Sequence, residues 1–235
     1  MRPTILLLHA FPLDSRMWEG HREALEAAGY TVVAPDLPGE PEATFAEWAR
    51  RVLRFVAGAF VPVGVSMGGY LIFELWRQAP ERIRALVLAD TRATPETPEA
   101  RQARDELIGV AGEQGVRAVW ERMRGKLLAP GAPPEVVARA EEIALDQPIT
   151  SIVATLEAIR DRADSRETLP TIGVPALVLV GEEDSLTPPS AAEEIAAAMP
   201  NAHLVVFPGC GHLPPLEKPQ EFRSALLGFL AEVAP

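Results

Sequence analysis

Six short apolar runs are the sequence feature that most limits what this chain can fold into. Because these runs are continuously apolar, they are typical of strands buried on both faces. All but one interval between their starts measure 24 to 30 residues, enough for a helical crossover between parallel neighbours. We therefore expect an α/β fold with a mainly parallel, six-stranded sheet covered by helices on both faces. The runs occupy residues 5–9, 31–36, 61–66, 85–90, 176–181 and 203–208.

Helical patterns fill most intervals between these runs. Gly29 and Gly58 follow the last apolar positions of two of them, and Pro200 closes another, as expected of helix ends. The last pattern should form a helix that packs back on the sheet. The predicted helices span residues 15–29, 44–58, 67–81, 188–200 and 219–233.

One interval is much longer than the others, because 91 residues separate the run that starts at Ala85 from the run that starts at Ala176. Apolar residues recur there at helical spacing, with breaks at Pro and Gly clusters. We interpret residues 93–168 as a helical cap inserted after the fourth strand. Residues 1–92 and 169–235 then form one core, which a chain of 235 residues is long enough to build.

Charge and cysteine content narrow the classes of partner. The net charge is −11 without any basic block, so a nucleic acid or an anionic membrane would be repelled. Cys210 is the only cysteine and cannot form a disulfide within the chain, which favours a reducing, cytoplasmic compartment. The apolar stretch at residues 4–8 is too short for a signal peptide, and no run is long enough to span a membrane.

The segment Gly64-Val65-Ser66-Met67-Gly68 fits the pattern G-x-S-x-G at the point where a predicted strand ends and a helix begins. Such a tight turn exposes the serine hydroxyl, and the small flanking residues allow neighbouring elements to come close. A serine hydroxyl is a weak nucleophile at neutral pH and needs a base that is oriented by a carboxylate. Ser66 is therefore a candidate nucleophile, and a structural Gly-Ser-Gly turn is the alternative.

Residues after two later predicted strands are candidates for the base and for the carboxylate that orients it. Asp184 follows the fifth run and His212 follows the sixth. The carboxyl ends of parallel strands lie at one edge of the sheet, so both side chains should meet Ser66 there. Asp90 also ends a strand and is the alternative carboxylate, whereas Glu182 and Glu183 are expected to be solvated loop residues.

In this order the segments resemble the α/β-hydrolase superfamily, and within it small capped carboxylesterases and 3-oxoadipate enol-lactonase-like serine hydrolases. The resemblance rests on "LLLHAFPLDSRMW", "VVAPDLPG", "GVSMGGY", "VPALVLVGEEDSLTPP" and "GCGHLPPLEKP". It implies that Ser66 is the nucleophile, His212 the general base and then acid, and Asp184 the orienting carboxylate. It further implies that the backbone N–H groups of Phe11 and Met67 hold the oxyanion, a role that suits a helix start and a strand-end turn.

The two amino-terminal strands usual in that superfamily are absent, so the run at residues 31–36 should become a sheet edge. An open edge can pair with a second copy of the chain. We therefore expect a monomer or a homodimer.

Other residues near the predicted site have simpler interpretations. His9 should be buried and hydrogen-bonded near the oxyanion turn, and Cys210 should be a small buried hydrophobic residue. Asp36 is expected to serve its own loop, with a role in anchoring the cap as the alternative. His21 and His203 should be surface residues. Some apolar cap residues should line a substrate pocket, although most residues at such spacing would be cap core. The candidates are Trp120, Met123, Leu127, Leu128, Ile152 and Leu156.

No cluster has metal-ligand spacing, and no phosphate-binding loop is present, so neither a metal nor a cofactor is expected. The predicted function is a serine hydrolase that cleaves small carboxylic esters or lactones through an acyl-enzyme. A C–C bond hydrolase or a cofactor-free perhydrolase would use the same triad and is the first alternative. The second alternative is a ligand-binding, weakly catalytic relative.

Overall fold

The computed structural model describes residues 2–37 and 44–233, and its centre is a six-stranded sheet. The strand order is β2-β1-β3-β4-β5-β6, and every neighbouring pair is parallel. The fold predicted from the apolar runs is confirmed. The strands are β1 (Thr4–Leu8), β2 (Val32–Val33), β3 (Phe60–Val65), β4 (Leu86–Ala89), β5 (Ala176–Gly181) and β6 (Ala202–Phe207).

The two edge strands differ from the prediction. The expected edge strand at residues 31–36 does lie at the edge, but β2 comprises only Val32 and Val33. The prediction that the sixth run is buried on both faces is wrong: β6 forms the other edge, and the Val206 side chain is 41% exposed. An edge strand has a neighbour on one side only, which leaves part of its surface open. All residues of β3 and β5 are buried.

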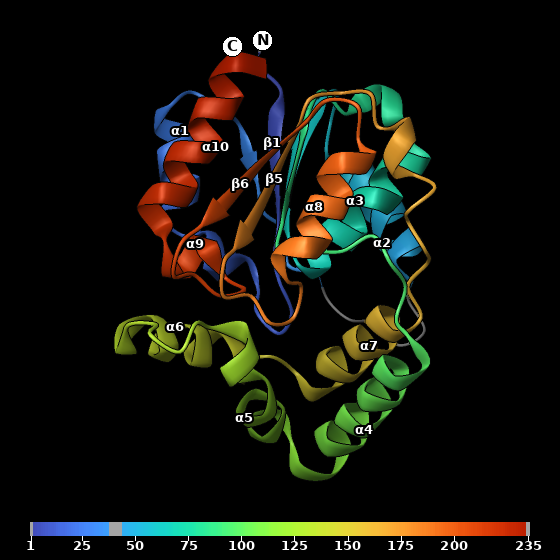
Figure 1. Ribbon diagram of the computed structural model, residues 1–235, viewed down its shortest axis with the longest axis vertical. Coiled ribbons are helices and arrows are strands. Elements are labelled where there is room, and N and C mark those ends of the chain that lie inside the picture. Colours follow the sequence, from blue (N-terminus) through green and yellow to red (C-terminus); the bar gives the residue numbers. More distant parts are fainter. Residues whose placement is uncertain (1, 38–43, 234–235) are drawn as a thin grey trace.

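Helices cover both faces of the sheet (Figure 1). One face carries α1 (His21–Ala27), α9 (Pro214–Glu217) and α10 (Pro219–Val233), and the other carries α2 (Phe45–Phe55), α3 (Met67–Gln78) and α8 (Pro189–Ala198). The pattern at residues 15–29 splits into a short 3-10 helix, Ser15–Trp18, and α1. α2 begins at a capping box in which Thr44 and Glu47 exchange hydrogen bonds.

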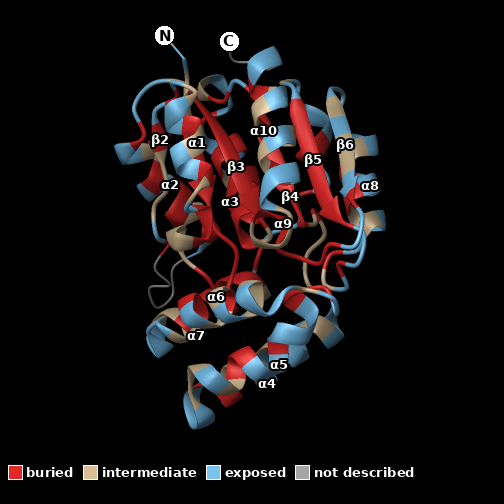
Figure 2. Cartoon of the chain, turned by 90° about the vertical axis from the view of Figure 1, so that its left-hand side faces the viewer, coloured by how far each residue is buried: buried red, intermediate tan, exposed pale blue. Residues whose placement is uncertain are grey.

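Four helices lie between β4 and β5 in the sequence and beyond the carboxyl ends of the strands in space (Figure 1). They are α4 (Pro98–Gln114), α5 (Val116–Leu127), α6 (Pro134–Leu145) and α7 (Ile149–Arg160), and together we call them the cap. Figure 2 shows the contrast in burial: the central strands are buried along their length, whereas the cap helices are largely exposed. No helix of the described ranges is both long and apolar enough to cross a membrane.

Candidate active site

Ser66 lies on a strained turn between β3 and α3. Its φ of 54° falls in the left-handed region, which residues with a side chain rarely adopt. The turn is held by hydrogen bonds from Ser66 N to Ala89 O, at 2.8 Å, and from Gly69 N to Ser66 O, at 2.9 Å. Because backbone strain of this kind persists only where the surrounding structure enforces it, the turn is a candidate functional site.

The two glycines of the motif are required by close packing. A Cβ on Gly64 would lie 2.5 Å from the carbonyl carbon of Gly68, and a Cβ on Gly68 would overlap the carbonyl oxygen of Leu8. Both obstacles are backbone atoms and cannot rotate away. The pattern G-x-S-x-G therefore allows β3, β1 and α3 to approach one another at the Ser66 turn.

Asp184 and His212 form a buried pair at the ends of β5 and β6. His212 Nδ1 lies 2.7 Å from Asp184 Oδ2, and both side chains are almost fully buried. Asp184 Oδ1 accepts hydrogen bonds from the backbone N–H groups of Leu186 and Thr187, at 2.8 and 3.0 Å. Burial alone would raise the pKa of Asp184, but the charge and hydrogen bond of His212 and two hydrogen bonds from Thr187 outweigh it and lower that pKa. Asp184 is thus held as a carboxylate that can orient the imidazole.

Asp90, the alternative carboxylate, has a different environment. It is 1% exposed with a φ of 45°, and its Oδ1 accepts a hydrogen bond from Gly181 N at 2.8 Å. Its Oδ2 has no hydrogen-bond partner among the described residues. Burial, and then the nearby charge of Asp184, raise the pKa of Asp90 well above its ordinary value. The geometry therefore favours Asp184, and not Asp90, as the partner of His212.

Two backbone N–H groups near Ser66 are free to bind an anion. Met67 is the first residue of α3, where the helix leaves its N–H groups without internal acceptors. Phe11 lies in the turn after β1 and lines the same pocket as Ser66. Neither N–H has an acceptor within residues 2–37 and 44–233. Both are therefore available as oxyanion donors.

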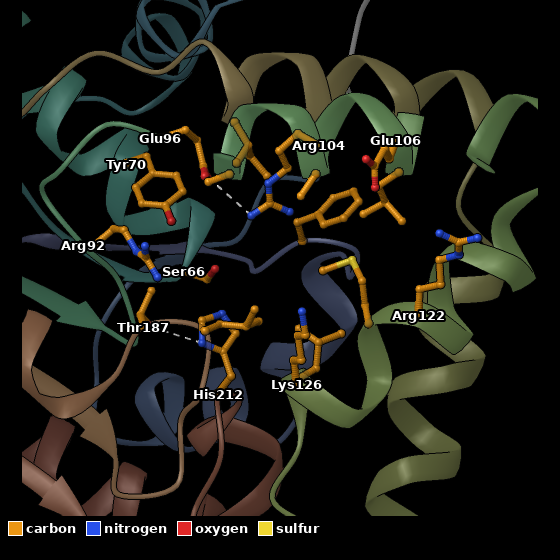
Figure 3. Close-up of a pocket in the computed structure, with 18 residues that line it drawn as sticks. Ser66, Tyr70, Arg92, Glu96, Arg104, Glu106, Arg122, Lys126, Thr187 and His212 are labelled. Atoms are coloured by element: carbon orange, nitrogen blue, oxygen red, sulfur yellow. Dashed lines mark hydrogen bonds and ion pairs between the residues drawn. The ribbon is translucent and has the colours of Figure 1, made fainter. Parts of the chain in front are cut away.

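A pocket of about 580 Å³ lies between the sheet edge and the cap, and Ser66 and His212 both line it (Figure 3). No hydrogen bond joins the Ser66 hydroxyl to His212 among the described side chains. Such contacts are often long in a ligand-free site and tighten when substrate binds. Of the predicted apolar lining residues, Met123 and Leu127 reach the pocket. The other four are buried outside its lining, as expected for most residues at such spacing: Trp120, Leu128, Ile152 and Leu156.

The remaining histidine predictions have mixed outcomes. His9 is buried, as expected, and its Nε2 accepts a hydrogen bond from Leu37 N at 2.9 Å. His203 is exposed, also as expected. The prediction that His21 lies at the surface is wrong: it is 2% exposed and packs edge-on against Trp18 and Phe222. The helical pattern does not reveal this contact, because α10, which contributes Phe222, comes from the far end of the chain.

Cys210, Glu182 and Glu183 lie as expected, whereas Asp36 bonds outside its own loop. Cys210 is buried, and burial raises the pKa of its thiol, so a thiolate nucleophile is disfavoured there. Asp36 accepts a hydrogen bond from Ser15 N at 3.0 Å and so joins two loops. Glu182 and Glu183 are exposed.

Sequence reasoning missed two residues that hold the site together. The Thr187 hydroxyl lies 2.5 Å from Asp184 Oδ2 and 3.2 Å from His212 Nδ1. Glu217 accepts hydrogen bonds from the backbone N–H groups of Ala129, Gly211 and Leu213, at 2.9 to 3.1 Å. The only signal for either was its position a few residues beyond a candidate, Thr187 after Asp184 and Glu217 after His212.

The Glu217 contacts tie the His212 loop to the end of α5. His212 N also donates to Leu127 O at 3.2 Å, so the loop and the cap share a set of hydrogen bonds that we call the clamp. The clamp consists of Leu127, Ala129, Gly211, His212, Leu213 and Glu217.

Among the described residues, one group of side chains combines the residue types that bind metal ions. Asp90, Asp184 and His212 offer ligand atoms within 4.8 Å of one another. Two of these atoms, His212 Nδ1 and Asp184 Oδ2, already face each other in a 2.7 Å hydrogen bond. A metal would have to replace that bond, and the arrangement suits a hydrogen-bonded base better.

Comparison with known proteins identifies the family of the chain. The alpha/beta hydrolase family matches residues 5–225 of the chain. A pimeloyl-[acyl-carrier protein] methyl ester esterase of Nitrosomonas europaea is 29% identical, over 94% of this chain and 93% of that protein.

Solved structures include a thermophilic esterase from Thermogutta terrifontis with malate bound, with a TM-score of 0.92 and 34% identity over 99% of this chain and 91% of the other. An enol-lactonase from Burkholderia xenovorans LB400 shares the fold, with a TM-score of 0.89 and 24% identity over 98% and 92% of the two chains. The family match covers nearly the whole chain, including both the sheet and the cap. This chain therefore belongs to the alpha/beta hydrolase family.

Proposed function

We propose that the protein is a carboxylic ester hydrolase that cleaves small esters or lactones through an acyl-enzyme on Ser66. One observation carries the proposal: the buried His212–Asp184 pair opens into the same pocket as a serine on a strained turn. A nucleophile, a base and a carboxylate that orients the base are the parts that acyl transfer requires. The esterase names of the two relatives reported above support the ester as the bond that is cleaved.

The first half-reaction transfers the acyl group to Ser66. His212 Nε2 accepts the hydroxyl proton while Ser66 Oγ attacks the carbonyl carbon of the ester. Asp184 accepts the Nδ1–H hydrogen bond, which keeps Nε2 unprotonated and stabilises the imidazolium that forms. His212 then gives its proton to the departing alkoxide, and an alcohol leaves.

The second half-reaction returns the enzyme to its starting state. His212 takes a proton from a water molecule, which attacks the acyl-enzyme, and Ser66 Oγ recovers the proton as the acid departs. In both steps the carbonyl oxygen becomes negative. The N–H groups of Phe11 and Met67 would stabilise that charge, a contribution typically worth about 3 kcal/mol per donor in the transition state.

The direct test is labelling by a fluorophosphonate, which phosphonylates an activated serine. The wild-type protein should react with one equivalent, and Ser66→Ala should not react. On a panel of esters and lactones, kcat/KM of Ser66→Ala should fall by about 10⁴-fold or more. Ser185→Ala is the matched control, because Ser185 is exposed in the loop that carries Asp184. An unlabelled but folded wild-type protein would refute the proposal.

The same panel separates the alternative reactions on one triad. Vinylogous diketones test for C–C bond cleavage, and added peroxide tests for perhydrolysis. If C–C bond cleavage or perhydrolysis is faster than hydrolysis of every ester on the panel, that reaction is the main activity instead of ester hydrolysis. Loss of kcat/KM at acidic pH is expected for all three, because a protonated His212 cannot accept the serine proton.

A further inference from the structure

The pocket is positively charged on a chain that is strongly negative. The whole sequence has a net charge of −11, yet four cationic side chains line the pocket beside two acidic ones, Glu96 and Glu106. The cationic residues come from three elements, the loop after β4, α4 and α5. They are Arg92, Arg104, Arg122 and Lys126.

One of the two acids is already neutralised within the protein. Glu96 lies 2.5 Å from Arg162, which is buried behind the pocket wall, and 3.5 Å from Arg104. The Glu96 side chain is only 6% exposed, so water screens its carboxylate little and the two ion pairs are its main interactions. Its negative charge therefore acts mainly on Arg162 and Arg104, and more weakly on Arg92.

Three of the lining cations have no carboxylate partner among the described residues, namely Arg92, Arg122 and Lys126. This sets them apart from every other cationic side chain between β4 and β5, because each of those is ion-paired. The paired residues are Arg101, Arg104, Arg117, Arg124, Arg139, Arg160, Arg162 and Arg166. In this part of the chain, unpaired positive charge is found only where it faces the pocket.

The positions of these cations on α5 place them beside an apolar strip. Arg122 and Lys126 are four residues apart, so they share one face of α5, and Met123 and Leu127 line the pocket from the adjoining positions. Figure 3 shows Lys126 extending into the space beside His212, with Arg122 farther out along the cap and Arg92 on the other side, near Tyr70. An aliphatic chain could pack on the strip while its charged end reaches a cation.

We propose that Arg92, Arg122 and Lys126 form a binding site for an anionic group on the substrate. The enzyme then prefers monoesters of aliphatic dicarboxylic acids, whose second carboxylate is free, over neutral esters of the same shape. This inference rests on the proposed ester hydrolysis. It adds a substrate class, because the site would recognise a charge that lies away from the bond being cleaved.

The test uses pairs of substrates that differ in charge and hardly in shape. Monomethyl succinate, monomethyl glutarate and monomethyl adipate are each compared with the methyl ester in which a carboxamide replaces the free carboxylate. For at least one chain length, kcat/KM of the anion should exceed that of the amide by roughly tenfold at low salt. The ratio should shrink as salt is added, because the cations are partly exposed and are screened.

Charge-removing variants then assign the preference to residues. Arg92→Gln, Arg122→Gln and Lys126→Gln should each lower the ratio of anion to amide by roughly two- to threefold, and Lys126→Arg should keep the wild-type ratio. Arg124→Gln is the matched control, because Arg124 lies on the same helix but is exposed and paired with Glu121 at 2.9 Å. That control should leave the ratio unchanged.

Either of two substrate ratios would overturn the inference, and so would one pattern of inhibition. One is a ratio near unity in the wild-type protein at low salt for every chain length. The other is a wild-type ratio that persists when all three cations are replaced in a variant with unaltered thermal unfolding. Inhibition of neutral-ester cleavage by free glutarate, without faster cleavage of its monoester, would also contradict a substrate site. None of these results affects the proposed function as long as the wild-type protein hydrolyses the neutral ester and Ser66→Ala does not. If the wild-type protein does not hydrolyse the neutral ester either, the proposed function itself is overturned.

Discussion

The sheet and the cap differ in how deeply their residues are buried. Residues of β1, β3, β4 and β5 are almost all fully buried, and their backbones pair in an unbroken parallel ladder. The cap helices bury only one stripe each and are linked to one another by side-chain ion pairs. Arg160 and Asp105 join α7 to α4 at 2.6 Å, for example, and Arg117 and Glu141 join α5 to α6 at 2.8 Å. The sheet thus fixes the reacting groups, while the cap has open surface on which a pocket can be lined.

The first prediction compares two ion pairs of the helical region. Arg162 and Glu96 are buried, with side chains 3% and 6% exposed, whereas Arg117 and Glu141 are 67% and 32% exposed. Glu96→Gln leaves a buried cation without its partner and should reduce the free energy of unfolding by about 3 kcal/mol or more. Glu141→Gln should cost about 1 kcal/mol or less. Urea unfolding of both variants checks this, and equal losses would contradict it.

The second prediction compares one glycine of the core with one of the cap. Gly68→Ala places a methyl group against the Leu8 carbonyl and should destabilise the protein by about 3 kcal/mol, because neither backbone can yield. Gly109 lies within α4 and has open space where a Cβ would lie, so Gly109→Ala should stabilise by up to about 1 kcal/mol. Thermal unfolding of the two variants should move in opposite directions. A loss of stability in both would show that α4 is less regular than described.

The third prediction compares buried carboxyl groups of the two regions, which have opposite pKa shifts. Burial raises the pKa of Asp90, so the folded state keeps a proton that the unfolded chain releases, and stability falls as pH rises above the ordinary carboxyl pKa. Burial would raise the pKa of Glu96 too, but Arg162 outweighs it and lowers that pKa. The stability that the ionised Glu96 contributes is therefore present above the ordinary carboxyl pKa. It is lost as the pH falls through the lowered pKa of Glu96 in the folded protein.

Two variants separate these dependences. Asp90→Asn keeps the acceptor for Gly181 N and should remove a falling slope of up to about 1.4 kcal/mol per pH unit that begins above the ordinary carboxyl pKa. Glu96→Gln should flatten the profile only below the ordinary carboxyl pKa. Urea unfolding across pH gives both slopes, and an unchanged slope above the ordinary carboxyl pKa in Asp90→Asn would contradict a raised pKa of Asp90.

The contrast between the fully buried sheet and the partly exposed cap also explains what could be predicted from the sequence. A strand buried on both faces must be apolar at every position, so residues 61–66 and 176–181 revealed β3 and β5 directly. Side chains at the carboxyl ends of parallel strands then meet by topology, which brought Asp184 and His212 together. β6 was mistaken for a buried strand, because an apolar run does not reveal whether the strand has one neighbour or two.

The cap was less predictable, because its helices pack by one stripe and the pattern does not say what that stripe faces. Met123 and Leu127 reach the pocket, while Trp120, about one turn before Met123, is buried within the cap. The lining cations were missed for the same reason, since a charged residue on an amphipathic helix usually faces solvent. Thr187 and Glu217 act through short loops whose shape depends on distant segments.

The clamp has a consequence for how freely this fold can exchange its parts. Leu127 and Ala129 belong to the cap segment by sequence, yet their backbone groups hold the loop that carries His212. A chimera that grafts a relative's cap onto this sheet would therefore replace part of the support of His212, the proposed proton acceptor. The segment that can be exchanged between relatives is thus shorter than the whole insertion, and a graft should keep residues 127–129 of this chain.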